Sequence, residues 1–179
     1  PGYVIILPGL IALALAAERL MTLSRIGSRV KTQSKNLSSA DSGNPLGRVL
    51  QVYSNNKGVD AETLQLKLDE AVLKEQPLIN ARIAFIKIIS MVAPLLGLLG
   101  TVIGMIVTFQ AITLFGTGDP KTMAGGISQA LITTVLGLTV AIPTVLLHSI
   151  VDSRAKGILH ILTEQSAGMV AQHAESSSS

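Results

Sequence analysis

The chain has 179 residues, of which 48% are hydrophobic and only 14% are charged, and its formal net charge is +3. Its length alone would fit one soluble domain. However, charged side chains are absent from residues 3–17, 88–118 and 122–147. The last two stretches exceed the roughly 20 apolar residues that a helix needs to cross a bilayer. The sequence therefore predicts an all-α integral membrane protein with three transmembrane helices and argues against a soluble domain.

The expected topology follows from the positions of the basic residues. Eleven of the fourteen Lys and Arg residues lie within residues 19–87. Basic loops mark the cytoplasmic side of a membrane. We therefore expect residues 19–87 and the tail 148–179 in the cytoplasm, the hairpin 116–122 in the periplasm, and a periplasmic N-terminus.

The first apolar stretch, within residues 1–18, is short for a span, so we expect transmembrane helix 1 to be truncated at its start. A signal peptide fits less well, since no basic segment precedes the apolar run and no clear cleavage site follows it.

The cytoplasmic segment 19–87 contains several local signals. Residues 31–45 are rich in Ser, Asn and Lys and predict a mobile loop. A short helix is expected at 46–54, and Asp60 is expected to cap a helix that begins at Ala61. Pro77 should bend or interrupt that second helix.

The other two spans are expected at 88–115 and 123–147. The first would be about 42 Å long as a helix, which exceeds the roughly 30 Å hydrocarbon core, so this helix must tilt or protrude. The apolar helical pattern continues beyond residue 147. Both long helices are therefore expected to extend into the cytoplasm.

Small residues recur at three- and four-residue steps in both long spans. They are Ala93, Gly97, Gly100, Thr101, Gly104 and Thr108 in the first, and Ala130, Thr133, Thr134, Gly137, Ala141 and Thr144 in the second. Transmembrane helices associate through close packing of such residues, which predicts a helix-packing role for Gly97, Gly100, Gly104, Gly137 and Ala141. Alternatively, the stripes form the polar lining of a cavity that holds another helix. Three spans would leave much of this surface uncovered, which favours an oligomer.

No ionisable side chain lies deep in any of the three spans. Threonine hydroxyls can guide water or a proton, but a titrating group at membrane depth would have to come from another chain. His148 is either interfacial or a proton exit, and Pro94 and Pro143 are either kinks or hinges. No nucleophile–base set, phosphate loop or metal cluster is apparent, so we expect no enzyme activity, cofactor or metal. Because the basic residues flank apolar spans, a lipid bilayer is the expected partner and nucleic acid is not.

Two segments carry a family resemblance. "APLLGLLGTVIGM" (93–105) and "GGISQALITTVLGLTVAIPTVLLH" (125–148), separated by a short hairpin, resemble the paired signatures of the MotA/TolQ/ExbB proton-channel family, closest to ExbB and TolQ. The resemblance implies a subunit of a proton-driven motor in the bacterial inner membrane. It implies a homo-pentamer around an ExbD- or TolR-like single-span subunit, which acts on a TonB- or TolA-like protein.

The resemblance also assigns residues to a proton path. Thr101 and Thr134 match the family's pore-facing threonines, and Thr133 and Gln129 are predicted to lie along the same path. The family commonly has a glutamate at the position of Gln129, and glutamine cannot titrate, so a structural and a pore-lining role both remain open. The expected function is ExbB-like energisation of outer-membrane import. A TolQ-like envelope-maintenance motor and a non-conducting membrane scaffold are the alternatives.

Overall fold

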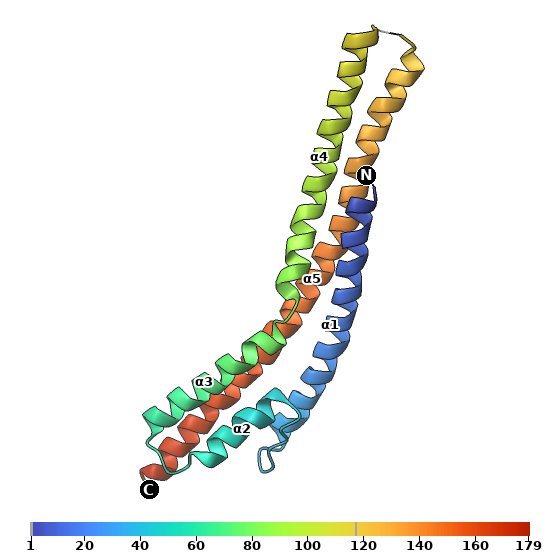
Figure 1. Cartoon of the computed structure of the whole chain (residues 1–179). Helices are drawn as coiled ribbons and strands as arrows, with labels where there is room; N and C mark the ends of the chain where they lie inside the picture. Colours follow the sequence, from blue (N-terminus) through green and yellow to red (C-terminus); the bar gives the residue numbers. More distant parts are fainter. Residues whose placement is uncertain (1, 117) are drawn as a thin grey trace. The chain divides into compact units, whose positions relative to one another are not determined.

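The computed structural model describes residues 2–116 and 118–179, and all regular structure within them is helical (Figure 1). The helices are α1 (Tyr3–Lys35), α2 (Pro45–Asn55), α3 (Ala61–Ile79), α4 (Ile83–Phe115) and α5 (Pro120–Ser177). Helices α1, α4 and α5 are each long and apolar enough to cross a membrane. The predicted all-α class with three membrane-spanning helices is therefore confirmed at this level.

The chain forms two compact units. The first contains Pro1–Ala17 and Arg82–Ser149, and the second contains Glu18–Ala81 and Ile150–Ser179. The first unit therefore comprises the apolar part of α1, all of α4 and the apolar part of α5. The second comprises the polar end of α1, α2, α3 and the polar end of α5.

Helices α4 and α5 approach each other closely in the first unit because glycines leave room between them. A Cβ atom added to Gly97 would lie 2.9 Å from the backbone oxygen of Thr133, and one added to Gly137 would lie 2.8 Å from that of Ala93. A Cβ on Gly104 would lie 2.6 Å from the Cβ of Ala130. At Gly97 and Gly137 the obstacle is backbone, which no rotamer change can move away.

Side-chain caps start both short helices of the second unit. Asn44 accepts a hydrogen bond from the Gly47 amide at 2.8 Å at the start of α2. Asp60 accepts one from the Thr63 amide at 3.0 Å at the start of α3, as predicted from the sequence. Hydrogen bonds from the Thr63 hydroxyl and amide lower the pKa of Asp60. The stabilisation by this cap is therefore complete above the ordinary pKa of an aspartate and is lost as the pH falls through the lowered pKa.

Two arginines link separate elements of the second unit. Arg48 of α2 forms a bidentate pair with Glu75 of α3, with both N–O distances 2.7 Å, and these bonds raise the pKa of the Arg48 guanidinium. Arg19 of α1 is 5% exposed and donates to the backbone oxygens of Leu78 at 3.2 Å and Ile79 at 2.7 Å. It thereby satisfies carbonyl groups at the C-terminal end of α3, where a cation is also favoured by the helix dipole.

Three local expectations need correction or refinement. The loop expected at 31–45 is wrong for residues 31–35, because α1 continues to Lys35 and buries Val30. The expected helix at 46–54 is α2, one residue longer at each end. Pro77 does not stop α3, which continues to Ile79. Pro77 lies in the last turn, where Arg19 donates hydrogen bonds to the terminal carbonyl groups of Leu78 and Ile79.

A substitution at the α4–α5 contact should test the packing. Gly137→Ala places a methyl group against the backbone of α4, so we expect a loss of about 1–3 kcal/mol of stability from overpacking. The measurement is the midpoint of SDS-induced unfolding in mixed micelles, followed by circular dichroism. Gly125→Ala is the matched control on the same helix, because no atom lies within 4 Å of its added Cβ. Equal midpoints for the two variants would contradict the close contact.

The Arg48–Glu75 pair should contribute to stability far more than a surface pair. Arg48→Gln leaves the Glu75 carboxylate, whose side chain is only 8% exposed, without its cation. We expect a loss of about 1–3 kcal/mol, seen as faster hydrogen exchange in α2 and α3. Lys74→Gln is the control, since it removes an exposed pair with Glu70 that contributes only about 0.3–0.5 kcal/mol. Similar exchange rates in the two variants would argue against a structural role for the buried pair.

Candidate functional site

Three threonine hydroxyls meet where α4 and α5 are closest. Thr101 extends from α4, and Thr133 and Thr134 extend from α5; we call these three residues the threonine cluster. The Thr101 hydroxyl contacts that of Thr134 and lies 3.5 Å from that of Thr133. It also lies 3.1 Å from the backbone oxygen of Ala130. All three side chains are partly buried in the first unit.

The backbone oxygen of Gly97 is the shared acceptor of the threonine cluster. It lies 3.2 Å from the hydroxyl oxygens of Thr101 and Thr133 and 3.4 Å from that of Thr134. Thr133 also reaches the backbone oxygen of Ala130 at 2.6 Å. Each hydroxyl has one proton, so the three threonines can make only three of these donations at a time.

The predicted packing residues surround the threonine cluster. Gly97 and Gly137 face each other across the two helices, and Cβ atoms added to Gly100 and Gly104 would meet Thr133 and Ala130. Ala141 is 4% exposed and lies further along α5. The glycines therefore set the helix separation at which side chains of α4 reach carbonyl groups of α5.

Gln129 lies outside the threonine cluster. Its side chain is exposed and makes no hydrogen bond with any described residue. The predicted path residues thus fall into two groups: three threonines joined at the α4–α5 interface, and one amide on the outer surface of this single chain.

One contact of the α4–α5 interface was not singled out from the sequence. A Cβ added to Gly126 would lie 2.6 Å from the hydroxyl of Thr108, and this hydroxyl donates to the backbone oxygen of Gly104 at 2.9 Å. A signal was present, because Gly126 precedes Ala130 by four residues and so continues the stripe of small residues on α5. The close packing therefore reaches about one turn further than the predicted stripe.

The chemistry available at the threonine cluster is hydrogen bonding without titration. Residues 88–118 and 122–147 contain no Asp, Glu, Lys, Arg or His. Within residues 2–116 and 118–179, no three His, Asp or Glu side chains gather as a metal site would need. The hydroxyls can donate to and accept from water or a polar group of another chain. At neutral pH they neither gain an additional proton nor lose their own.

Comparison with known proteins places these helices in a family. The profile of the MotA/TolQ/ExbB proton channel family matches residues 41–164, which include α4 and the apolar part of α5. A putative biopolymer transport protein ExbB-like 3 from Synechocystis is 31% identical over 160 residues, which cover 80% of this chain and 76% of that protein.

Two further relatives match shorter regions. Biopolymer transport protein ExbB from Helicobacter pylori is 49% identical over 57 residues, covering 32% of this chain and 39% of the relative. Tol-Pal system protein TolQ from Pseudomonas aeruginosa is 30% identical over 89 residues, covering 50% of this chain and 38% of the relative. Together with the three apolar helices, these matches identify a multi-pass membrane protein. The chain belongs to the MotA/TolQ/ExbB proton channel family.

Proposed function

We propose that this chain is an ExbB-like subunit of a motor in the bacterial inner membrane that is driven by the proton-motive force. With an ExbD-like single-span partner, it energises a TonB-like protein for import across the outer membrane. The observation that carries this proposal is the threonine cluster, three linked hydroxyls within two stretches that contain no ionisable side chain.

The cluster supports conduction only together with a second chain. Thr101, Thr133 and Thr134 provide hydroxyls beside the proton path, while a carboxylate on the partner helix binds and releases the proton. A buried charge is costly in a membrane and is usually functional where it occurs. One elementary charge crossing 100 mV releases about 2.3 kcal/mol, so a few protons suffice to drive a conformational step.

The proposed assembly is a homo-pentamer that surrounds the partner helices. The apolar part of α4 exposes many large side chains in the single chain, among them Leu95, Leu98 and Ile106. Such surfaces suit lipid and neighbouring copies. The exposed side chain of Gln129, which has no hydrogen-bond partner among the described residues, supports a proposed role either in bonding to a neighbouring helix or in lining the ring. The basic segment 19–87 supports a cytoplasmic location for that segment and a periplasmic N-terminus.

A TolQ-like envelope-maintenance motor is the second candidate within the same mechanism. It is supported by the match to TolQ from Pseudomonas aeruginosa. The match to ExbB from Helicobacter pylori supports the ExbB-like role in the same way. A non-conducting scaffold would need the small residues for packing alone and would give the threonine hydroxyls no part in transport.

The subunit composition tests the proposed motor directly. Native mass spectrometry of the complex extracted from its own membrane should show five copies of this chain together with a small single-span protein. The sequence of that protein would distinguish the ExbB-like from the TolQ-like pathway. A monomer or dimer with no small partner, in gentle detergent, would favour the scaffold.

Substitutions at the threonine cluster test the proposed conduction. Thr101→Val and Thr134→Val keep the shape of the side chain but remove the hydroxyl. We expect proton flux into vesicles holding the whole complex to fall by about tenfold or more, which corresponds to a barrier about 1.4 kcal/mol higher. Thr101→Ser restores a hydroxyl and should recover most of the flux.

The matched control is Thr139→Val on the same helix. The Thr139 side chain is exposed, and its hydroxyl donates only to the Val135 oxygen of its own helix at 2.7 Å. This variant should conduct normally. Normal flux in Thr101→Val and Thr134→Val, with the complex intact, would exclude the hydroxyls from the proton path. A loss of assembly in these variants would instead assign them to packing.

A further inference from the structure

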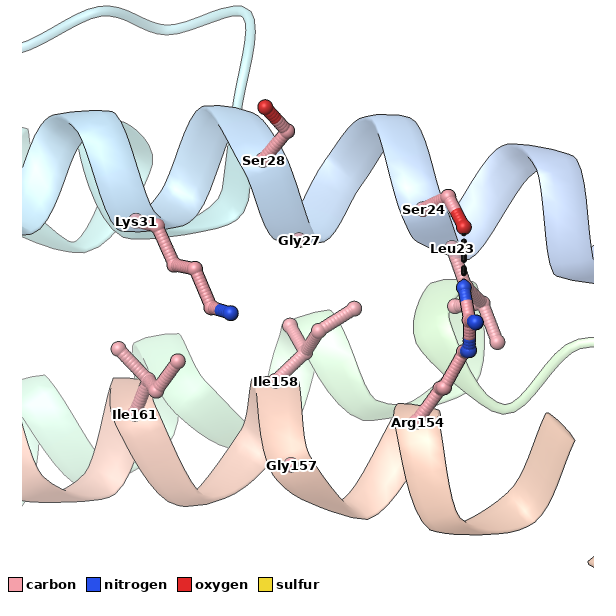
Figure 2. A pocket seen from close by; sticks show the side chains of 9 residues that line it. All are labelled: Leu23, Ser24, Gly27, Ser28, Lys31, Arg154, Gly157, Ile158 and Ile161. Carbon is pink, nitrogen blue, oxygen red and sulfur yellow. Dashed lines mark hydrogen bonds between the residues drawn. The ribbon is translucent and has the colours of Figure 1, made fainter. Parts of the chain in front are cut away.

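A groove of about 560 Å³ lies between α1 and α5 within the second unit (Figure 2). Its apolar lining comes from Leu23 of α1 and from Ile158 and Ile161 of α5. Figure 2 shows the Lys31 side chain extending into the space between the two helices and the Arg154 guanidinium directed at the Ser24 hydroxyl. The groove therefore combines an apolar wall with two cations.

Within residues 2–116 and 118–179, neither cation of the groove has a carboxylate partner. Lys31 makes no side-chain hydrogen bond or ion pair with any described residue, and the Arg154 side chain bonds only to Ser24 within the described part of the chain. No acidic residue lies between Glu18 and Asp41, whereas Lys and Arg recur through this segment. On α5, Asp152 pairs with Lys156. Neither Lys31 nor Arg154 forms an ion pair with a described residue, so an anion could enter without displacing one.

Two glycines keep the groove open. A Cβ added to Gly157 would meet no atom within 4 Å, and one added to Gly27 would meet only Ile158, at 3.8 Å. The space between the cations is thus unfilled by the chain itself. An occupant can contact both the positive charges and the apolar wall.

The groove also lies close in sequence to two membrane spans. Ser24 comes seven residues after Ala17, where one charge-free stretch ends, and Arg154 comes seven residues after Leu147, where another ends. Seven residues are about two helical turns, or about 10 Å. The headgroup region adds about 5–8 Å on each side of the hydrocarbon core, so its outer edge is expected close to Ser24 and Arg154. The ligand most accessible to such a groove is a lipid of the same membrane leaflet.

We propose that this groove binds an anionic phospholipid. The phosphate lies between Arg154 and Lys31, and an acyl chain lies against the apolar surface of the groove. Basic pockets and polybasic segments next to membrane helices recognise anionic lipids by this charge complementarity. A zwitterionic lipid would bring its own cation against Arg154, and a free phosphate would leave the apolar wall unused. This site is separate from the threonine cluster, so its test does not depend on the proposed motor function.

Lipid competition tests the proposal. The full-length protein, purified in a neutral detergent, is incubated with equimolar dioleoyl phosphatidylglycerol and dioleoyl phosphatidylcholine, and bound lipids are counted by native mass spectrometry. The two lipids have the same acyl chains, so the ratio reports the headgroup. We expect phosphatidylglycerol to be preferred about thirtyfold, the effect expected of two nearby cations.

Paired variants assign any preference to the groove. Lys31→Gln/Arg154→Gln should lower the preference to about one. Lys57→Gln/Lys67→Gln removes the same charge elsewhere in the second unit and should leave it unchanged. Gly157→Leu adds a side chain at a position where an added Cβ meets no atom within 4 Å, and it should prevent binding by occupying the open space. Gly168→Leu is its control on the same helix, since its Cβ also meets no atom within 4 Å.

Three results would overturn the proposal. The first is equal binding of the two lipids by the unaltered protein. The second is a phosphatidylglycerol preference that persists in both Lys31→Gln/Arg154→Gln and Gly157→Leu. The third is displacement of the lipid by inorganic phosphate at the same concentration, which would identify a site for a free anion. If the charge variant fails to fold, the comparison of Gly157→Leu with Gly168→Leu decides the question.

Discussion

The close approach of α4 and α5 at Gly97 and Gly137 is the contact on which the rest of the first unit depends. In a membrane the helices gain little by burying apolar surface against each other, so packing and hydrogen bonds must hold them together. Only at this separation does the Thr101 hydroxyl reach the Ala130 oxygen of the other helix, at 3.1 Å. The contact between the two backbones and the hydrogen bond between the helices thus both depend on glycine having no side chain.

The sequence predicted the parts of the fold that the membrane dictates. Three stretches without charge required three long helices, since a chain in lipid must satisfy its own backbone. Gly97, Gly100 and Gly104 share one side of α4, because residues three and four apart lie on the same face of a helix, and Cβ atoms added there would meet α5. The capping role of Asp60 was predicted equally well, since it depends on only three neighbouring residues.

Contacts between distant segments could not be predicted in the same way. Sequence composition suggested a loop at residues 31–35, but burial of Val30 and Gln33 in the second unit accompanies the extension of α1 to Lys35. Arg19 bonds to the backbone oxygen of Ile79, sixty residues away, and no local pattern indicates this contact. The role of the Gly97 oxygen was also hidden, because every residue has such a carbonyl and only the helix pairing selects this one.

The arrangement of hydroxyls in the threonine cluster has a further consequence. Thr101 can donate to α4 at Gly97, or across to α5 at Ala130, while Thr133 has the same two acceptors. The same oxygen positions therefore accommodate several proton arrangements, each with a different electric dipole. When a charge arrives beside these helices, the O–H bonds can rotate so that their dipoles stabilise it, while both backbones stay still. The rigid contact between the glycines thus fixes the positions of the hydroxyl oxygens, while the dipoles of the O–H bonds remain free to reorient.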